Sequence, residues 1–325
     1  MPTRRSAIGV VAALGLVPRH SKAQPATEHR RLGILMPSGE ADPETSRRLN
    51  VVRTKLDELG SNLDLVIKYV SGDPAKAAGL AKDLVAARVD IILTAGTEAS
   101  RAALDATKDL PIVMATIGDP VGIGLAKSLS HPGGNITGFS LNASDLSAKR
   151  VEFARACIPD VRYIAVLGNM SNDSVLLKAK NIAEASAVYH IGTKRFDVAG
   201  PSMMSGVLDD VRDWKADVIL TTEDTVVVAN RNTLMKLATG HRIPVMSEFA
   251  VLADAGAVLS YGPATIDLWK RSAIYIDKIL RGTSPSVLPI EQPNSFELVL
   301  NRRSAEALGL RFPLNLEGFA ERIIE

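Results

Sequence analysis

Short apolar runs alternate along the chain with longer amphipathic segments. Residues 31–37 (RLGILMP) form a nearly continuous apolar run, as expected for a parallel strand that is covered on both faces. In the following segment, apolar residues recur at spacings of three and four, at Leu49, Val52, Leu56 and Leu59. This spacing predicts a helix with one buried face. Asp42-Pro43 before the segment and Gly60 after it mark its ends.

The alternation continues and then begins a second time near residue 162. Further strands are expected at residues 63–70, 90–96, 111–119 and 135–141, and then at 162–169, 192–198, 217–224, 244–248 and 256–262. Two successive series of strands with helices between them predict an α/β protein with two Rossmann-like parallel-sheet lobes in tandem. The last segment has a helix at 266–280 and a strand at 296–301 after a proline-rich stretch. We expect this segment to return to both lobes and tie them together.

The composition agrees with two globular domains. The chain has 325 residues, 46% of them hydrophobic, and a formal net charge of +2. The length suggests two domains, and the apolar content excludes intrinsic disorder. The balanced charge provides no basic face for nucleic acid. Cys157 is the one cysteine, which excludes an intrachain disulfide and a cysteine-based zinc site, and we expect its thiol to be buried on a helix.

The N-terminus has the pattern of a sorting signal. Residues 1–23 contain four basic residues and no acidic one, around an apolar run of 11 residues at 7–17. A membrane span takes roughly 20 residues. The pattern therefore predicts a secretory signal peptide that is cleaved after Ala23, and a periplasmic mature protein. Arg4-Arg5 leaves open whether export follows the twin-arginine or the general route. Cleavage would change the formal charge from +2 to −2.

Small polar residues gather where the predicted strands end. In open α/β sheets, ligands bind at the carboxyl ends of strands, beside helix N-termini. The candidate ligand-binding residues at these ends are Gly96, Thr97, Asp119, Thr137, Ser140, Asn169, Asn172, Asp224 and Tyr261. Hydroxyl groups and helix N-termini can bind a carboxylate, and Asp119 or Asp224 can bind an ammonium group, which together predict an amino-acid-like zwitterion. Turn formation and helix capping are the alternative roles for these residues.

Motifs for catalysis and cofactor binding are missing from the sequence. The five histidines are scattered without metal-ligand spacing, and neither a P-loop nor a nucleophile elbow occurs. Gly122 and Gly124 match part of a dinucleotide fingerprint but follow the fourth predicted strand rather than the first. We therefore expect no enzyme activity, no cofactor and no metal. Trp214 and Trp269 lie at the apolar spacing of helices and are expected in the core.

Several sequence blocks are typical of one family. They are Asp119-Pro120-Val121-Gly122 with Gly124-Leu125, Pro132-Gly133-Gly134-Asn135, Thr137-Gly138, Lys149-Arg150-Val151-Glu152, Ser260-Tyr261-Gly262 and Phe296-Glu297-Leu298. These blocks resemble the substrate-binding proteins of ABC transporters, in the group described as tryptophan/tyrosine or general amino-acid binding. The resemblance implies the type I periplasmic-binding-protein fold, in which two lobes joined by three crossovers close over a small solute and dock on a membrane permease.

The resemblance also divides the chain. It implies a first lobe of residues 30–142 and 263–290 and a second of 143–262 and 291–325. The crossings would lie near 141–144, 262–264 and 289–293. The loops that would face the cleft follow Gly96, Asp119, Ser140, Asn169 and Asp224. The loop at 221–225 carries an additional acid, Glu223. Few aromatic residues are expected near the cleft beyond Phe139, Phe249 and Tyr261.

The leading hypothesis is an exported, monomeric, non-enzymatic component of an ABC importer that captures an amino acid or a related carboxylate. A cytoplasmic ligand-sensing transcription regulator shares this two-lobed core. It would need a basic helix-turn-helix before the first lobe, for which residues 1–30 are too few and too apolar. An exported α/β enzyme is the third hypothesis, which the missing catalytic motifs disfavour.

Overall fold

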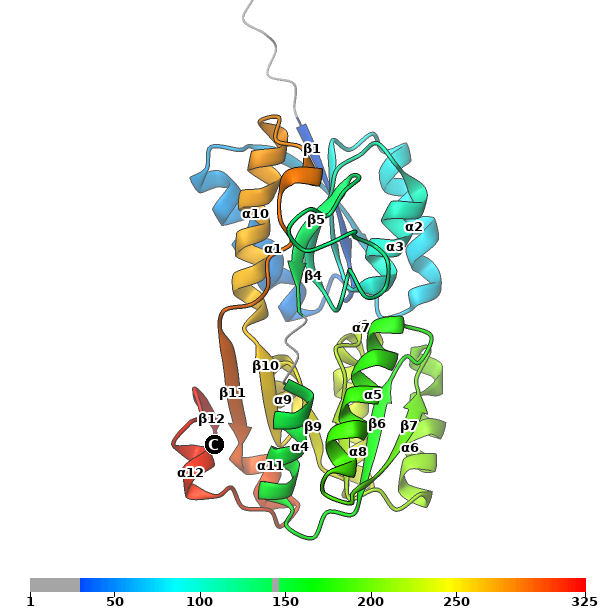
Figure 1. Cartoon of the computed structure of the whole chain (residues 1–325), viewed down its shortest axis with the longest axis vertical. Helices are drawn as coiled ribbons and strands as arrows, with labels where there is room; N and C mark the ends of the chain where they lie inside the picture. Colours follow the sequence, from blue (N-terminus) through cyan, green and yellow to red (C-terminus); the bar gives the residue numbers. More distant parts are fainter. Residues whose placement is uncertain (1–29, 142–145) are drawn as a thin grey trace, which may run out of the picture.

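Helices cover both faces of two separate β-sheets in the computed structural model, which describes residues 30–141 and 146–325 (Figure 1). Each sheet with its helices forms one lobe, and the two lobes lie end to end along the long axis. The predicted fold class, two parallel-sheet α/β lobes, is confirmed. The predicted signal peptide, residues 1–23, lies outside the described residues. Within the described ranges, no helix is both long and apolar enough to cross a membrane.

The first lobe is built on a five-stranded sheet whose strands are all parallel. The order along the sheet is β2 (Leu63–Tyr69), β1 (Arg30–Met36), β3 (Ile91–Ala95), β4 (Ile112–Ile117) and β5 (Ile136–Ser140). The helices are α1 (Pro43–Glu58) and α10 (Thr265–Leu280) on one face, and α2 (Ala77–Ala86) and α3 (Thr97–Ala106) on the other, with the short η1 (Pro74–Lys76) before α2.

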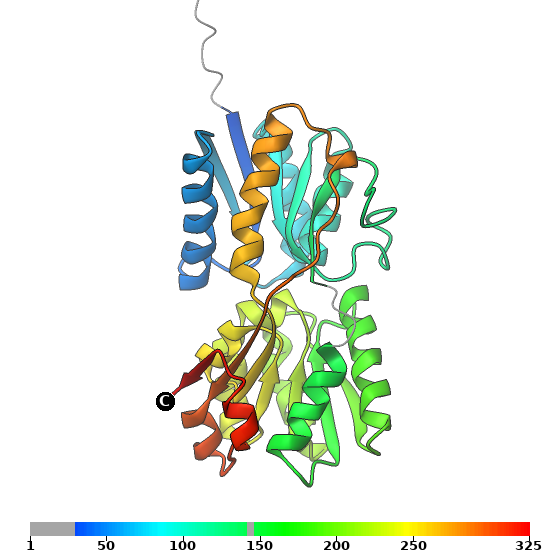
Figure 2. The same cartoon turned by 60° about the vertical axis from the view of Figure 1, so that its left-hand side comes forward.

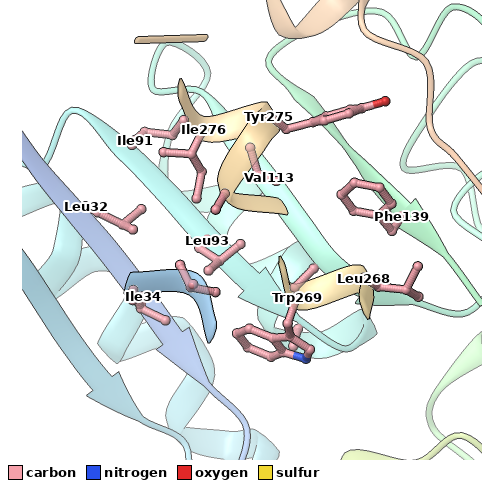
Figure 3. Close-up of a cluster of buried hydrophobic side chains, with 14 of the residues drawn as sticks. Leu32, Ile34, Ile91, Leu93, Val113, Phe139, Leu268, Trp269, Tyr275 and Ile276 are labelled. Carbon is pink, nitrogen blue, oxygen red and sulfur yellow. The ribbon is translucent and has the colours of Figure 1, made fainter. Parts of the chain in front are cut away.

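Successive side chains of each strand point to opposite faces of the sheet, so this lobe has two hydrophobic cores. Leu32 and Ile34 of β1 pack with α1 and α10, whereas Leu35 packs with α2 and α3. Figure 3 shows the first of these cores, with Trp269 of α10 lying over the sheet. Because both faces are covered, the inner strands β1, β3 and β4 are mostly apolar, as predicted for β1.

The second lobe is built on a seven-stranded sheet. Its order is β12 (Arg322–Ile324), β11 (Phe296–Asn301), β10 (Leu259–Pro263), β9 (Val245–Ser247), β8 (Val218–Thr221), β6 (Tyr163–Gly168) and β7 (Gly192–Asp197). Only the β10–β11 pair of this sheet is antiparallel. One core contains residues of α4 (Leu146–Cys157), α5 (Asp173–Ala187), α11 (Arg302–Ala307) and α12 (Leu314–Glu317). The opposite core contains residues of α6 (Met204–Asp213), α7 (Thr225–Ala229), α8 (Arg231–Gly240) and α9 (Ala250–Ala255).

Three connections join the lobes (Figure 2). The first follows β5 and runs into α4, through residues 142–145, which lie outside the described ranges. The second is Ala264, between β10 of the second lobe and α10 of the first. The third follows η3 (Pro285–Val287) and Glu291, which still forms a bridge with Phe139 of β5, before the chain reaches β11.

Local sequence signals explain where several elements begin. The Asp42 side chain accepts a hydrogen bond from the Glu44 N–H at the start of α1, and Asp73 accepts one from the Ala75 N–H at η1. Cys157 is buried at the end of α4, as expected, and burial raises the pKa of its thiol to about 12. The thiol is therefore a packing group rather than a nucleophile.

Candidate ligand-binding site

A small cavity of about 40 Å³ lies between the two lobes. The first lobe lines it with the carboxyl ends of β1, β3 and β4 and the start of α10. The second lobe lines it with the loops that follow β8 and β9. Both sheets therefore point their ligand-binding ends at the same space, as sequence reasoning predicted from the polar strand ends.

The N-terminus of α3 opens on this cavity. Gly96 is the N-cap residue and provides no side-chain hydrogen bond to the first N–H groups of this ten-residue helix, which have no acceptor within the helix itself. Gly96 has a φ of 88°, and a Cβ there would lie 2.5 Å from Cγ2 of Thr225 in the second lobe. Both the backbone angle and the approach of the second lobe therefore require glycine at this position.

Glu223, in the loop after β8, brings a carboxylate to the cavity wall. The residue is buried, yet neither of its carboxylate oxygens has a hydrogen-bond partner among the described residues. Oε1 lies against Gly118 at the end of β4, where there is no room for a Cβ. Burial raises the pKa of Glu223 to about 7, although Lys178 opposes this shift. A buried carboxylate without a hydrogen bond is unusual in a folded protein and could accept one from a ligand.

Asp224 also borders the cavity, but its side chain accepts hydrogen bonds from backbone N–H groups. Its Oδ2 accepts a hydrogen bond from the Asn169 N–H at 2.9 Å, and its Oδ1 accepts one from the Val227 N–H at 3.0 Å. Burial, and then the nearby Glu98 carboxylate, raise its pKa to about 7. Both oxygens therefore hold the loop and cap α7, and the ammonium-binding role of Asp224 stays a prediction.

The side chains of Asn169 and Asn172 form hydrogen bonds across the interface between the lobes and do not line the cavity. Both side-chain amides donate hydrogen bonds to Oε1 of Glu98 in the first turn of α3, at 3.3 and 2.8 Å. Asn172 also caps α5. Close by, Thr97 lines the cavity, and its hydroxyl donates to Oγ of Ser174 at 3.3 Å. These contacts hold the two lobes together at the edge of the cavity.

The remaining predicted residues lie away from the cavity. Asp119 accepts a hydrogen bond from the Gly122 N–H in a turn. The hydroxyls of Thr137 and Ser140 donate to backbone carbonyls, those of Leu288 and Gly118. Tyr261 packs edge-on against Phe153, 5.2 Å between ring centres, in a separate hollow of the second lobe. The structure therefore does not bring these four side chains to the cavity that holds Glu223.

Two aromatic side chains line the cavity, Trp269 and Phe249. Trp269 is buried in the core, as predicted, but its ring also reaches the cavity wall. Of the three aromatic residues expected near the cleft, only Phe249 lines this cavity, because Phe139 lies in the core and Tyr261 lies elsewhere. The expectation therefore missed Trp269, since its apolar helical spacing gives the same signal for a core residue and for a cavity wall.

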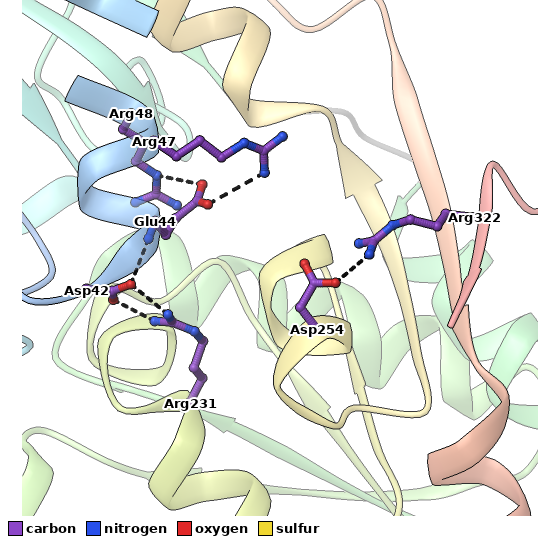
Figure 4. Close-up of polar contacts among 7 residues, drawn as sticks. All are labelled: Asp42, Glu44, Arg47, Arg48, Arg231, Asp254 and Arg322. Carbon is purple, nitrogen blue, oxygen red and sulfur yellow. Dashed lines mark hydrogen bonds and ion pairs between the residues drawn. The ribbon is translucent and has the colours of Figure 1, made fainter. Parts of the chain in front are cut away.

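Arg48 is a further cavity residue that sequence reasoning missed. It lies on the buried face of α1, 5.6 Å from the centre of the Trp269 ring, and its Nε donates to Glu44 at 3.1 Å. Next to it, Asp42 and Arg231 form a bidentate ion pair across the lobes, with both distances 2.7 Å (Figure 4). The sequence does contain a signal for Arg48, which precedes Val52 and Leu56 at intervals of four and therefore lies on the same buried face of the helix. A charged residue at a buried helix position usually has a partner.

Two parallel-sheet lobes, three connections and a shared cavity at their strand ends define the type I periplasmic-binding-protein fold. Residues 52–324 match the family model of the ABC transporter substrate binding proteins. The chain belongs to this family of solute-binding proteins, as the sequence blocks predicted.

Individual relatives agree with this assignment. A tyrosine-binding protein of Clostridioides difficile is 24% identical over 252 residues, which make up 78% of this chain and 72% of that protein. The crystal structure of an ABC domain from Streptococcus pneumonia in complex with L-Trp superposes with a TM-score of 0.83 at 25% identity, covering 90% of this chain and all of that one. A conserved domain protein from Vibrio cholerae shares the fold, with a TM-score of 0.84 at 24% identity and coverages of 91% and 100%.

Proposed function

We propose that the protein binds an aromatic amino acid between its lobes and delivers it to an ABC importer. One observation carries the proposal: the Glu223 carboxylate, which has no hydrogen-bond partner among the described residues, and the N-terminus of α3, which has no side-chain cap, border the same interlobe cavity. An α-amino acid has the complementary pair of charges. Its ammonium group would donate to Glu223, and its carboxylate would accept from the first N–H groups of α3.

The side chain of the ligand would pack against Trp269 and Phe249. Aromatic rings favour such offset or edge-on contacts with other rings. The ligands of two relatives support this choice, since one is a tyrosine-binding protein and the other was crystallised with L-Trp. We therefore place L-tryptophan and L-tyrosine first among the ligands to test.

Ligand entry requires the lobes to separate. A cavity of about 40 Å³ has room for a few water molecules, which is far too little for an amino acid. The three connections would act as the hinge, and the interlobe contacts of Glu98 and Arg231 would re-form as the lobes close. The described conformation is then the closed one, and binding proceeds through an open form.

The export route and the partner follow from the same proposal. A substrate-binding component of an importer acts outside the cytoplasmic membrane, which agrees with a signal peptide cleaved after Ala23. The mature protein would work as a monomer and present its closed, loaded form to a permease. Mass spectrometry of the exported protein would test the cleavage site, and a first residue other than Gln24 would contradict it.

A thermal-shift panel tests the ligand. The purified protein is heated with each of the amino acids and with sugars, nucleosides and dicarboxylates. Ligand at 100 times its Kd should stabilise the fold by about 2.7 kcal/mol, and we expect this shift from L-tryptophan or L-tyrosine. Tryptamine lacks the carboxylate and indole-3-propionate lacks the amine, so each should give a much smaller shift. A shift from a sugar or nucleoside with none from any amino acid would overturn the proposal.

A further inference from the structure

Glu223 stands at one end of a buried row of four charges with alternating sign. The order is Arg150 of α4, Glu248 after β9, Lys178 of α5 and Glu223 after β8. Nη1 of Arg150 lies 2.8 Å from Oε2 of Glu248. Nζ of Lys178 lies 4.0 Å from Oε1 of Glu248 and 3.8 Å from Oε2 of Glu223. The row therefore leads from the interior of the second lobe to the ligand cavity.

All four side chains are at most 4% exposed, so each charge has lost nearly all of its hydration. Buried charges persist only when opposite charges compensate them, and the row contains two cations and two anions. The pairing is nevertheless incomplete. Only Arg150 and Glu248 are within hydrogen-bond distance, and both oxygens of Glu223 remain without a hydrogen-bond partner among the described residues.

The long separation of Lys178 from Glu223 has a chemical consequence. At 3.8 Å the ammonium group attracts the carboxylate electrostatically but does not donate a hydrogen bond to it. The lone pairs of Glu223 therefore stay available to a second donor. A lysine at hydrogen-bond distance would occupy them, and an apolar residue in its place would leave the buried carboxylate without a compensating charge.

Some charged groups around Glu223 favour its ionised form, and others favour its protonated form. Lys178 and Arg150 favour its ionised form, whereas Glu248, Asp119 and burial favour its protonated form. Ser174 of α5, which also faces this region next to Gly118, carries no charge. The state of Glu223 thus depends on a balance in which Lys178 is the nearest cation.

We propose that Lys178 is a positioning residue for ligand recognition, held in place by the Arg150–Glu248 pair, and that it keeps Glu223 ionised so that the site accepts ligands carrying a protonated amine. This inference rests on the proposed function, because it assigns the amine of the amino acid to Glu223. Lys178 itself does not contact the ligand in this scheme. It acts through the carboxylate that does.

Two substitutions should shift ligand binding in opposite directions along the pH axis. Lys178→Met removes the nearest cation, so Glu223 should protonate at higher pH, and the affinity at pH 7 should fall by up to about tenfold for each pH unit of that shift. Glu248→Gln removes the anion that competes for Lys178, so Glu223 should stay ionised to lower pH, and the affinity at pH 6 should rise. The amide is isosteric with the carboxylate, and its oxygen can still accept a hydrogen bond from Nη1 of Arg150, so this second variant keeps the shape of the row and removes only the charge.

Calorimetric titration of L-tryptophan and L-tyrosine between pH 5.5 and 8.5 tests the inference, with ¹³C NMR of the Glu223 side-chain carboxyl to follow its ionisation. Lys178→Arg should restore much of the wild-type profile. Lys180→Met, on the exposed side of the same helix, is the matched control and should change nothing.

The outcomes separate this inference from the proposed function. Opposite shifts of the two variants, in both the NMR titration and the affinity, support the positioning role. Shifts in the same direction, or unchanged profiles, overturn it even where the amino acids bind. If the unsubstituted protein binds neither amino acid at any pH, the proposed function is wrong instead.

Discussion

Glu223 and Asp224 are adjacent acids with different tasks. Both are buried, and burial raises the pKa of each to about 7. The two carboxylate oxygens of Asp224 accept hydrogen bonds from the backbone N–H groups of Asn169 and Val227. The oxygens of Glu223 have no hydrogen-bond donor among the described residues. Hydrogen bonding, rather than burial or charge, therefore distinguishes the structural acid from the proposed ligand acid.

Asp224→Ala should destabilise the fold. The substitution removes the cap of α7 and leaves two backbone N–H groups without their acceptor, so the free energy of unfolding should fall by about 2 kcal/mol. Urea denaturation at pH 6 measures this change, with Asp105→Ala on the exposed side of α3 as the control. Unchanged stability together with lost amino-acid binding would return Asp224 to the ligand-binding role.

The raised pKa of Glu223 also predicts how stability depends on pH. Between the ordinary value of 4.5 and about 7, the folded state binds a proton at Glu223 that the unfolded state has released. Glu223 therefore makes the ligand-free protein less stable as the pH rises through this window, and has a constant effect above it. Urea denaturation from pH 4.5 to 8 should show that Glu223→Gln gains stability relative to the unsubstituted protein as the pH rises. A variant that lost stability with rising pH would contradict this sign.

At the scale of elements, the sequence predicted the long helices and the buried strands better than the short pieces. α1 begins at Asp42-Pro43, where the capping signal placed it, and β1 and β3 coincide with apolar runs. The apolar pattern did not predict α7, α9, α12 and β12, which have three to six residues each. A helix this short has only one or two turns, and a strand this short has only three positions. Neither is long enough to show a repeat of apolar residues.

The candidate site was predictable by location more than by residue. Strand ends indicated the edge of both sheets at which the interlobe cavity lies, and Gly96 and Thr97 line this cavity. Thr137 and Ser140 occupy the same edge, yet their hydroxyls bind carbonyls of their own lobe. Whether a hydroxyl faces the cavity depends on which hydrogen-bond acceptor the fold places next to it. For Thr137 this acceptor, the carbonyl of Leu288, lies 151 residues away in the sequence.

The end of β4 should control how closely the lobes approach. A Cβ at Gly118 would meet Glu223 and would lie 2.6 Å from Oγ of Ser174, both in the second lobe. Gly118→Ala should therefore oppose closure and weaken amino-acid binding by roughly 5- to 150-fold, since overpacking of about 1 to 3 kcal/mol corresponds to this range. Gly79→Ala in α2, where a Cβ meets nothing within 4 Å, should bind like the unsubstituted protein. Equal binding by both variants would show that the lobes do not close to this distance.

On the scale of the whole molecule, two groups of direct contacts join the lobes on opposite sides of the cavity. Asp42 and Arg231 pair on one side of the cavity, and Glu98 accepts hydrogen bonds from the second lobe on the other. Both groups are largely buried in the interface, so opening must rehydrate them. The balance between the open and closed forms therefore depends on how far the lost ion pair and hydrogen bonds outweigh the regained hydration.

Arg231→Met should shift the ligand-free protein toward the open form. The lost ion pair leaves closure dependent on the Glu98 contacts, so the radius of gyration in small-angle X-ray scattering should increase, and saturating amino acid should reverse the increase. Arg212→Met, which breaks an exposed pair within the second lobe, is the control. A variant as compact as the unsubstituted protein would assign the Asp42–Arg231 pair no role in closure.

The central claim is that Glu223 receives the amine of an amino acid between the lobes. Isothermal titration calorimetry of the protein and of Glu223→Gln tests it most directly, with L-tryptophan and with indole-3-propionate, which has no amine. The loss of a charge-assisted hydrogen bond of about 1.5 to 3 kcal/mol should weaken L-tryptophan binding by roughly 10- to 100-fold in the variant. Indole-3-propionate should bind both proteins equally weakly. If both proteins bind L-tryptophan with the same affinity, Glu223 does not receive the amine and the account is wrong.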